Sequence, residues 1–323
     1  MTAAGARRDL SVVIPVYRGA ATLPALVERL VPVLEGLGSS WELVLVDDGS
    51  PDDSWKRMLE LHRRHPDRVV AVRLMRNFGQ HNALMCGLRR ARGETVVTMD
   101  DDLQHPPEEL PKLLAALRER ELDLVYGAFE ERRHRAWRNL GSSVMTTVFR
   151  WLFGVDFGFT SFRAMRRELV RSVFTYDLNF TFLDGLLAWN TDRIGAVPVR
   201  HDTRARGETG YSTAKLLLLS LNMLTNFSLA PLQLVAWLGV LAAGIGLALG
   251  SVFLVAALAG QVLVPGYASL IVAVLMLGGI QMLALGIIGE YLGRVHLNIN
   301  RKPQFVEREV LGPGPAESPS KEA

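Results

Sequence analysis

Cysteine is nearly absent from this chain of 323 residues, in which Cys86 stands alone. A single cysteine excludes an internal disulfide framework and favours a reducing, cytoplasmic compartment for the part of the protein that carries it. Isolated thiols are more often small core residues than nucleophiles, so we expect Cys86 to be structural. A large net charge is also lacking, since the formal value is only +3. That value gives no argument for a nucleic-acid partner, and we expect none.

Charge is almost missing from one long stretch. Between residues 228 and 293 there is no Lys or Arg, and Glu290 is the single acid. The apolar segments 232–259 and 268–293 each exceed the roughly 20 residues that a helix needs to cross a bilayer, although a buried soluble hairpin is the alternative. The link between them is uncharged, whereas Arg294, Arg301 and Lys302 follow the second segment. By the positive-inside rule, we expect both ends of this hairpin to lie in the cytoplasm.

The first half of the chain alternates short apolar runs with helical patterns. Strands are expected at residues 10–16, 43–46, 69–74 and 95–99, with helices over 23–37 and 82–90 between them. Continuous apolar strands with helical crossovers predict an α/β fold whose mainly parallel sheet is covered on both faces. Ligands bind such sheets at the carboxyl ends of the strands. The polar residues that follow these strands, which we expect on one edge of the sheet, are Tyr17, Asp48, Asn77 and Asp100.

Three consecutive carboxylates follow the strand at residues 95–99. Asp100, Asp101 and Asp102 repel one another unless a cation neutralises them. Alternate residues of an extended segment point the same way, so Asp100 and Asp102 can face one ligand. Hard oxygen ligands suit Mg²⁺ or Mn²⁺, ions that commonly arrive with phosphates. The alternative is a solvated acidic loop or a helix N-cap before Pro106.

Arginine is concentrated between residues 132 and 171, where nine Arg stand against two acids. Such a basic surface attracts phosphates or an anionic lipid leaflet. Two amphipathic segments lie at about residues 136–153 and 213–227. Each fits a core helix, but ahead of a membrane span we expect interfacial helices that lie in the headgroups.

Seven short motifs occur in order along the chain: 13–17 (VIPVY), 46–50 (VDDGS), 77–80 (NFGQ), 100–104 (DDDLQ), 162–163 (FR), 201–211 (HDTRARGETGY) and 288–294 (IGEYLGR). Through them the chain resembles the family 2 glycosyltransferases of GT-A fold. Within that family it is similar to the polyprenyl-phosphate glycosyltransferases, the group that includes dolichol-phosphate mannose synthase and bacterial enzymes of envelope glycosylation. Each motif alone is weak, but their order and their attachment to two C-terminal spans are specific.

The resemblance implies a division of the chain. A cytoplasmic GT-A domain, a Rossmann-like and mainly parallel sheet, is expected over residues 1–212, including the interface helix at about 136–153. A second interface helix at 213–227 leads into residues 228–293, which hold the two transmembrane helices. Residues 294–323 would form a cytoplasmic tail. The implied location is the bacterial plasma (inner) membrane, which the chain would cross more than once.

The resemblance also implies roles at the nucleotide-sugar donor. The residues implied there are Pro15, Tyr17, Asp47, Asp48, Asp100 and Asp101. Asp48 would accept a hydrogen bond from the base, while Asp47 would cap or orient the turn. Asp100 and Asp102 form the family's DxD element, and Gln104 joins them around Mg²⁺ or Mn²⁺. That ion would act as a Lewis acid on the leaving diphosphate.

Basic residues are implied at the phosphates. Arg138 and Ser142 match positions that hold the acceptor phosphate, and Arg204 matches one near the donor phosphates. With Asp100 and Asp102, Arg138 and Arg204 would form the catalytic set. The chain departs from many relatives at four positions, so the donor sugar does not follow from any one relative. These positions are Gly19, Phe129, Thr160 and Ser161.

The implied activity is metal-dependent, inverting transfer of a sugar from a UDP- or GDP-linked donor to a polyprenyl phosphate. Transfer to a hydroxyl, as in polysaccharide synthases, is the enzymatic alternative, with Asp184 as the base. A membrane scaffold without catalysis is the other alternative. The partners expected are the nucleotide sugar, the polyprenyl phosphate and the membrane. Glycine-rich spans, which allow close helix packing, and the resemblance both favour a homo-oligomer.

Overall fold

Four apolar runs of the N-terminal half form the centre of one sheet in the computed structural model. They are β1 (Arg8–Val16), β2 (Trp41–Asp47), β3 (Val69–Leu74) and β4 (Gly93–Thr98), paired in parallel in the order β4-β1-β2-β3. All seven residues of β2 are buried, because helices cover both faces of the sheet. The structure describes residues 8–129, 159–176, 182–202, 228–259, 267–300 and 303–313.

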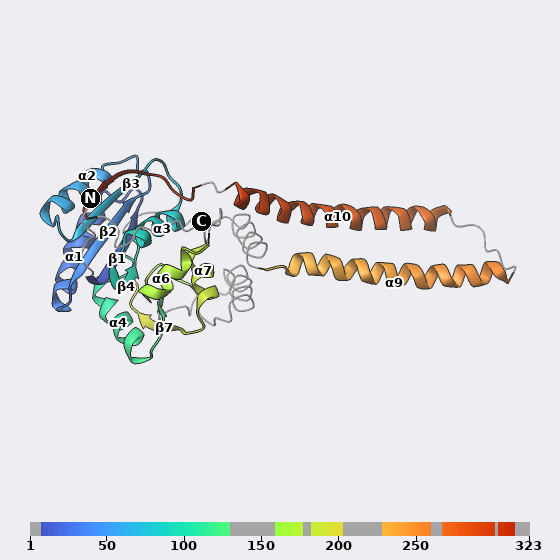
Figure 1. The fold of residues 1–323 in the computed structure, drawn as a ribbon, viewed down its shortest axis with the longest axis horizontal. Coiled ribbons are helices and arrows are strands. Elements are labelled where there is room, and N and C mark those ends of the chain that lie inside the picture. The colour runs from blue at the N-terminus through green and yellow to red at the C-terminus, as the bar shows by residue number, and fades with distance from the viewer. Residues whose placement is uncertain are drawn as a thin grey trace. The chain divides into compact units, whose positions relative to one another are not determined.

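Four further strands extend the sheet to eight, in the order β7-β5-β6-β4-β1-β2-β3-β8. Figure 1 shows the central strands side by side, from β4 through β1 and β2 to β3. They are β5 (Leu124–Phe129), β6 (Arg163–Arg166), β7 (Ile194–Val199) and β8 (Glu307–Leu311). β6 runs antiparallel to both β4 and β5, whereas β5 and β7 are parallel. The predicted α/β fold with a mainly parallel sheet is therefore confirmed.

Helices follow the strands as crossovers. They are α1 (Leu23–Gly36), α2 (Ser54–Arg64), α3 (Gln80–Arg90), α4 (Leu110–Glu119), α6 (Arg167–Val173) and α7 (Leu183–Asn190), with a 3₁₀ turn, η1, at Pro107–Glu109. In α1 the buried residues Leu23, Leu26, Leu30 and Leu34 recur every three or four positions, which gives the helix one apolar stripe for the sheet. Helix α3 follows the carboxyl end of β3 and packs on β1 and β2. Its first turn therefore lies at the edge where these strands end.

Strand β8 comes from the part of the chain that follows the second long apolar segment. It pairs antiparallel with β3, and Glu307 accepts hydrogen bonds from Nε (3.2 Å) and Nη2 (2.5 Å) of Arg90. The Cys86 thiol, which is buried as expected, also donates to Glu307. The sequence predicted a cytoplasmic tail over residues 294–323, and this strand was not among the elements expected from the sequence. Residues 301–323 group with residues 1–211 in one compact unit.

The second unit, residues 212–300, contains two long helices, α9 (Ala230–Leu258) and α10 (Tyr267–Ile299). Both are long and apolar enough to cross a membrane, over residues 230–249 and 276–296. Large apolar side chains point outward along both helices, and Trp237 is 72% exposed. An outward apolar surface is what lipid contact requires. Near the end of α10, Arg294 donates to Glu290 at 2.6 Å, and the two residues lie one helical turn apart.

Candidate active site

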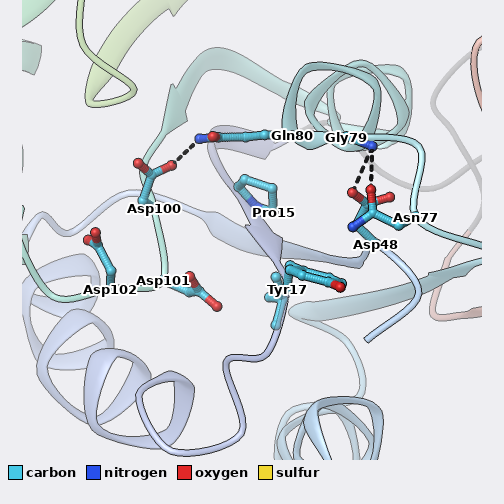
Figure 2. A pocket seen from close by; sticks show the side chains of 10 residues that line it. Pro15, Tyr17, Asp48, Asn77, Gly79, Gln80, Asp100, Asp101 and Asp102 are labelled. Carbon is cyan, nitrogen blue, oxygen red and sulfur yellow. Dashed lines mark hydrogen bonds between the residues drawn. The ribbon is translucent and has the colours of Figure 1, made fainter. Parts of the chain in front are cut away.

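A pocket of about 280 Å³ lies at the carboxyl ends of the central strands (Figure 2). The structure places Tyr17, Asp48, Asn77 and Asp100 around it, as the strand pattern predicts. The loops after β1, β2, β3 and β4 meet there because parallel strands end on the same edge. Among the described residues, the lining consists of Pro15, Val16, Tyr17, Asp48, Asn77, Gly79, Gln80, Asp100, Asp101 and Asp102.

Asp48 is held rigidly on one side of this pocket. Its two carboxylate oxygens accept hydrogen bonds from the backbone N–H groups of Phe78 (2.7 Å) and Gly79 (2.9 Å). Burial raises the pKa of Asp48 above its ordinary value, although these two bonds act in the opposite direction. Gly79 has φ +92°, a conformation that favours glycine and turns its N–H toward Asp48. Each carboxylate oxygen of Asp48 keeps a lone pair for a ligand. The half-exposed ring of Tyr17 lines the same pocket (Figure 2).

Asp47 does not line the pocket, although its neighbour Asp48 does. The Asp47 side chain is fully buried, accepts from the backbone N–H of Ser50 at 2.9 Å and pairs with Arg73 at 3.4 Å. Adjacent residues at a strand end point to opposite sides, so only one of the two can face the ligand. These contacts fit the role of capping or orienting the turn, which the resemblance implies for Asp47.

Asp100 is anchored from two directions on the opposite side of the pocket. Its Oδ1 accepts from Nε2 of Gln80 at 2.6 Å, and its Oδ2 accepts from Oγ of Ser161 at 2.5 Å (Figure 2 shows the Gln80 bond). The Ser161 carbonyl in turn accepts from Oγ1 of Thr98 at 2.6 Å. Sequence reasoning missed Gln80 and Ser161 as site residues. The available signals were their positions inside the NFGQ motif and just before the FR motif.

The middle carboxylate of the acidic run is packed against the β1 loop. Oδ2 of Asp101 is buried and has no hydrogen-bond partner in the described part of the chain. Burial, and then the charges of Asp100 and Asp102, raise the pKa of Asp101 to about 7. A Cβ on Gly19 would lie 2.0 Å from this oxygen. A larger residue at position 19 would therefore clash with the Asp101 carboxylate. The glycine there, at which the chain departs from many relatives, leaves room for Asp101.

Asp102 and Gln104 form the turn that leaves the site. Oδ1 of Asp102 accepts from the backbone N–H of Gln104 at 3.1 Å, and Gln104 is not among the residues that line the pocket. Three other predicted site residues, Arg138, Ser142 and Arg204, lie outside the described residues, as do the segments 136–153 and 213–227.

Comparison with known proteins decides the family. Residues 11–174 match glycosyl transferase family 2. The chain belongs to this family. It is 36% identical over 323 residues to an undecaprenyl-phosphate 4-deoxy-4-formamido-L-arabinose transferase of Pseudomonas paraeruginosa, covering 96% of this chain and 93% of that protein. A transferase of the same name from Salmonella paratyphi B is 32% identical over 311 residues, covering 95% and 94%. The predicted family and the prediction of a glycosyltransferase are thus confirmed.

A solved structure similar to this glycosyltransferase confirms the fold. It is glucosyl-3-phosphoglycerate synthase from Mycobacterium tuberculosis in complex with Mg²⁺ and uridine diphosphate, with a TM-score of 0.50 and 24% identity. The likeness covers 67% of this chain and 79% of the synthase. At this identity it shows a shared fold only.

The acidic run of the glycosyltransferase fits a divalent cation that arrives with its substrate. Among the described residues no group of three or more His, Cys, Asp or Glu side chains could hold a metal ion. Mg²⁺ is commonly held by one or two carboxylates and completes its shell with water and substrate phosphates. Asp100 and Asp102 can supply those carboxylates. Next to them, the buried Oδ2 of Asp101 accepts no hydrogen bond from the described part of the chain.

Asp184 of the glycosyltransferase is buried in an ion pair away from this pocket. It pairs with Arg163, which is 1% exposed, and accepts a hydrogen bond from Oη of Tyr126 at 2.9 Å. Nε of Arg163 also donates to Oγ1 of Thr98 at 3.0 Å. A carboxylate with these partners, absent from the pocket lining, is not placed to take a proton from an acceptor hydroxyl. This arrangement argues against the base role that the sequence left open for Asp184.

Proposed function

We propose that this glycosyltransferase moves a sugar, with inversion, from a nucleotide sugar to a polyprenyl phosphate at the cytoplasmic face of the bacterial inner membrane. One observation carries the proposal. A single pocket joins Asp48 to Asp100 and Asp102, in a chain that matches undecaprenyl-phosphate transferases over almost its whole length. The two helices that are long and apolar enough to cross a membrane support a multi-pass attachment, which would bring the enzyme to a lipid acceptor.

The donor would lie across the pocket. The base packs on Pro15 and Tyr17 and donates an N–H to Asp48, while the diphosphate reaches the opposite side at Asp100 and Asp102. Asp100 and Asp102, with Gln104 near them, would hold a Mg²⁺ or Mn²⁺ ion, which would supply Lewis-acid stabilisation of the leaving diphosphate. Gln80 and Ser161 hold Asp100 in place for this task.

The acceptor needs positioning rather than deprotonation. A polyprenyl phosphate is already an anion at neutral pH, so an oxygen of its phosphate attacks the anomeric carbon without a general base. The bond from that carbon to the diphosphate breaks, and the nucleoside diphosphate leaves with the electron pair. We assign Arg138 and Ser142 to the acceptor phosphate and Arg204 to the donor phosphates, since guanidinium groups bind phosphate bidentately.

The pairing of Asp184 with Arg163 disfavours transfer to a hydroxyl, which would need a free base. The anchored Asp100 and the buried Asp48 disfavour a scaffold without catalysis, because burying and orienting carboxylates is costly without a ligand.

A transfer assay tests the proposal. The full chain in detergent is incubated with labelled UDP- and GDP-sugars, Mn²⁺ or Mg²⁺ and polyprenyl phosphate, and sugar extractable into organic solvent is counted. We expect a lipid-linked product from one donor class, and none when the polyprenyl phosphate is omitted. The absence of lipid product with every donor would reject the proposal.

Replacement of Asp48 tests the nucleotide end. Asp48→Ala removes the acceptor for the base, so we expect nucleotide affinity to fall about tenfold or more, with a smaller loss of turnover at saturating donor. Titration with UDP and GDP followed by calorimetry measures this, with the exposed Asp67→Ala as the matched control. Unchanged affinity for the nucleotide that supports transfer would show that Asp48 does not contact the base.

Replacement of Arg138 tests the acceptor end. We expect Arg138→Ala to raise the apparent KM for polyprenyl phosphate and to lower kcat, while donor affinity stays constant. If Arg138 only anchors the domain to lipid, a short soluble acceptor would restore normal turnover. Full recovery with that acceptor therefore rejects the assignment.

Replacement of Ser161 tests how Asp100 is held. Ser161→Ala removes one of the two bonds to the Asp100 carboxylate, and loss of such supporting contacts lowers metal affinity by about 10- to 100-fold. Binding of Mn²⁺ in the presence of nucleotide, followed by electron paramagnetic resonance, measures this independently of turnover. Ser161→Thr, which keeps the hydroxyl, is expected to bind Mn²⁺ more tightly than Ser161→Ala. Equal Mn²⁺ affinity in Ser161→Ala and wild type would contradict the role.

We also propose a homo-oligomer that packs through the long helices. A Cβ on Gly239, Gly244, Gly278 or Gly286 would meet no other atom within 4 Å, so these faces are open to another helix. Mass measurement in nanodiscs tests this, and a purely monomeric protein would reject it.

A further inference from the structure

The compact unit formed by residues 1–211 and 301–323, called the catalytic unit below, has a second pocket that lies away from the active site. It measures about 290 Å³, and it forms where the segment that follows α10 lies against the second half of α3 and the end of α6. Gln80, in the donor pocket, and Arg89, in this one, are nine residues apart on α3, which is roughly 13 Å along the axis. The lining residues are Met85, Arg89, Phe174, Tyr176, Pro303, Gln304 and Phe305.

Arg89 is the cationic group of this pocket. Its side chain is exposed, and its guanidinium lies over the rings of Phe174 (5.3 Å) and Phe305 (5.2 Å). Glu307, the acid nearby, pairs with the neighbouring Arg90, and Arg89 makes no ion pair within the described ranges. The two rings orient the guanidinium while its five N–H donors stay available for an anion.

The walls of the pocket suit an anion that carries an apolar chain. Met85, Phe174 and Phe305 provide apolar surface on either side of the guanidinium. The ring of Tyr176 also lines the pocket and lies 6.0 Å from that of Trp189, and such amphipathic rings favour the membrane–water interface.

The position of the pocket in the chain points to the membrane as the source of this anion. Pro303 follows the end of α10, Ile299, by only four residues. Arg301 and Lys302 stand between them in the sequence, and basic residues next to a span attract anionic lipids.

We propose that this pocket binds an anionic phospholipid of the surrounding bilayer. The guanidinium of Arg89 holds the headgroup phosphate, and Phe174 and Phe305 contact the apolar part next to it. Bound lipid would tie the catalytic unit to the membrane surface, where a lipid acceptor is presented. The site goes beyond the proposed transfer reaction, and its test needs no turnover, so either proposal can fail without the other.

Lipid binding to the full chain tests the site. The delipidated protein in an uncharged detergent is titrated with dihexanoyl phosphatidylglycerol, and binding is followed by calorimetry. We expect saturable binding by the wild type and about a tenfold or greater loss of affinity in Arg89→Ala, because the charge-assisted bonds to phosphate are gone. The matched control is Arg63→Ala, an exposed arginine of α2 that makes no ion pair within the described ranges, which should bind as the wild type does. Phe305→Ala should weaken the lipid while leaving binding of inorganic phosphate unchanged.

Four outcomes would overturn the proposal. Equal affinity of Arg89→Ala and wild type would remove Arg89 from the site. Equal binding of dihexanoyl phosphatidylcholine would show that the anionic headgroup is not recognised. Inorganic phosphate that binds as tightly as the lipid would indicate a plain anion site. Arg89-dependent binding of farnesyl phosphate that is tighter than that of phosphatidylglycerol would assign the pocket to the polyprenyl acceptor instead.

Discussion

Asp102→Asn is expected to lower kcat by about 10²- to 10³-fold, because it removes one of the two carboxylates proposed to hold the cation at the leaving diphosphate. The fold should survive. Asn keeps the shape of the side chain, and its carbonyl oxygen can still accept from the N–H of Gln104. Removing one negative charge from a run of three also relieves repulsion among Asp100, Asp101 and Asp102.

Turnover measured against Mn²⁺ concentration separates binding from chemistry in this variant. Asp67→Asn makes the same chemical change at an exposed position outside the pocket and should leave turnover unchanged. EDTA should abolish the activity of the wild type. Full activity of Asp102→Asn, or full activity of the wild type in EDTA, would contradict the assignment of a metal-dependent site to this acidic run.

Asp184→Ala is expected to destabilise the catalytic unit by about 3–5 kcal/mol, because it leaves a buried cation without its partner. Arg163 is 1% exposed, and Asp184 is its ion-pair partner. Tyr126, fully buried, loses the acceptor of its hydroxyl in the same step. The penalty is large because a guanidinium cannot lose its charge by deprotonation.

Thermal unfolding in detergent measures this loss. For a unit of this size, 3–5 kcal/mol corresponds to a fall in Tm of about 6–20 °C. Asp192→Ala, which removes an exposed acid near the end of α7, is the matched control and should leave Tm unchanged. The base alternative makes the opposite prediction, an unchanged Tm with lost turnover. That result would restore Asp184 as a candidate catalytic residue.

The strands and helices that position the donor pocket were predictable from local pattern. Val12, Val13 and Ile14 form an unbroken apolar run, and a strand buried on both faces needs such a run. The acidic run at Asp100 follows another buried strand, so its place at the carboxyl edge followed from chain order alone. The two long apolar helices were equally predictable, since bilayer thickness sets the minimum length that an uncharged segment needs to cross a membrane.

The sequence by itself therefore determined the sheet, the edge that carries the site, the acidic residues on that edge and the two long apolar helices. Tertiary structure decided which side chains reach one another. Ser161 meets Asp100 across 61 positions, and Glu307 meets Arg90 across 217. The ion pair of Asp184 with Arg163 and the pairing of β8 with β3 are also contacts between separate elements of the chain. Periodicity reports the face and length of one element, whereas such contacts depend on how separate elements pack, and packing has no local signature in the chain.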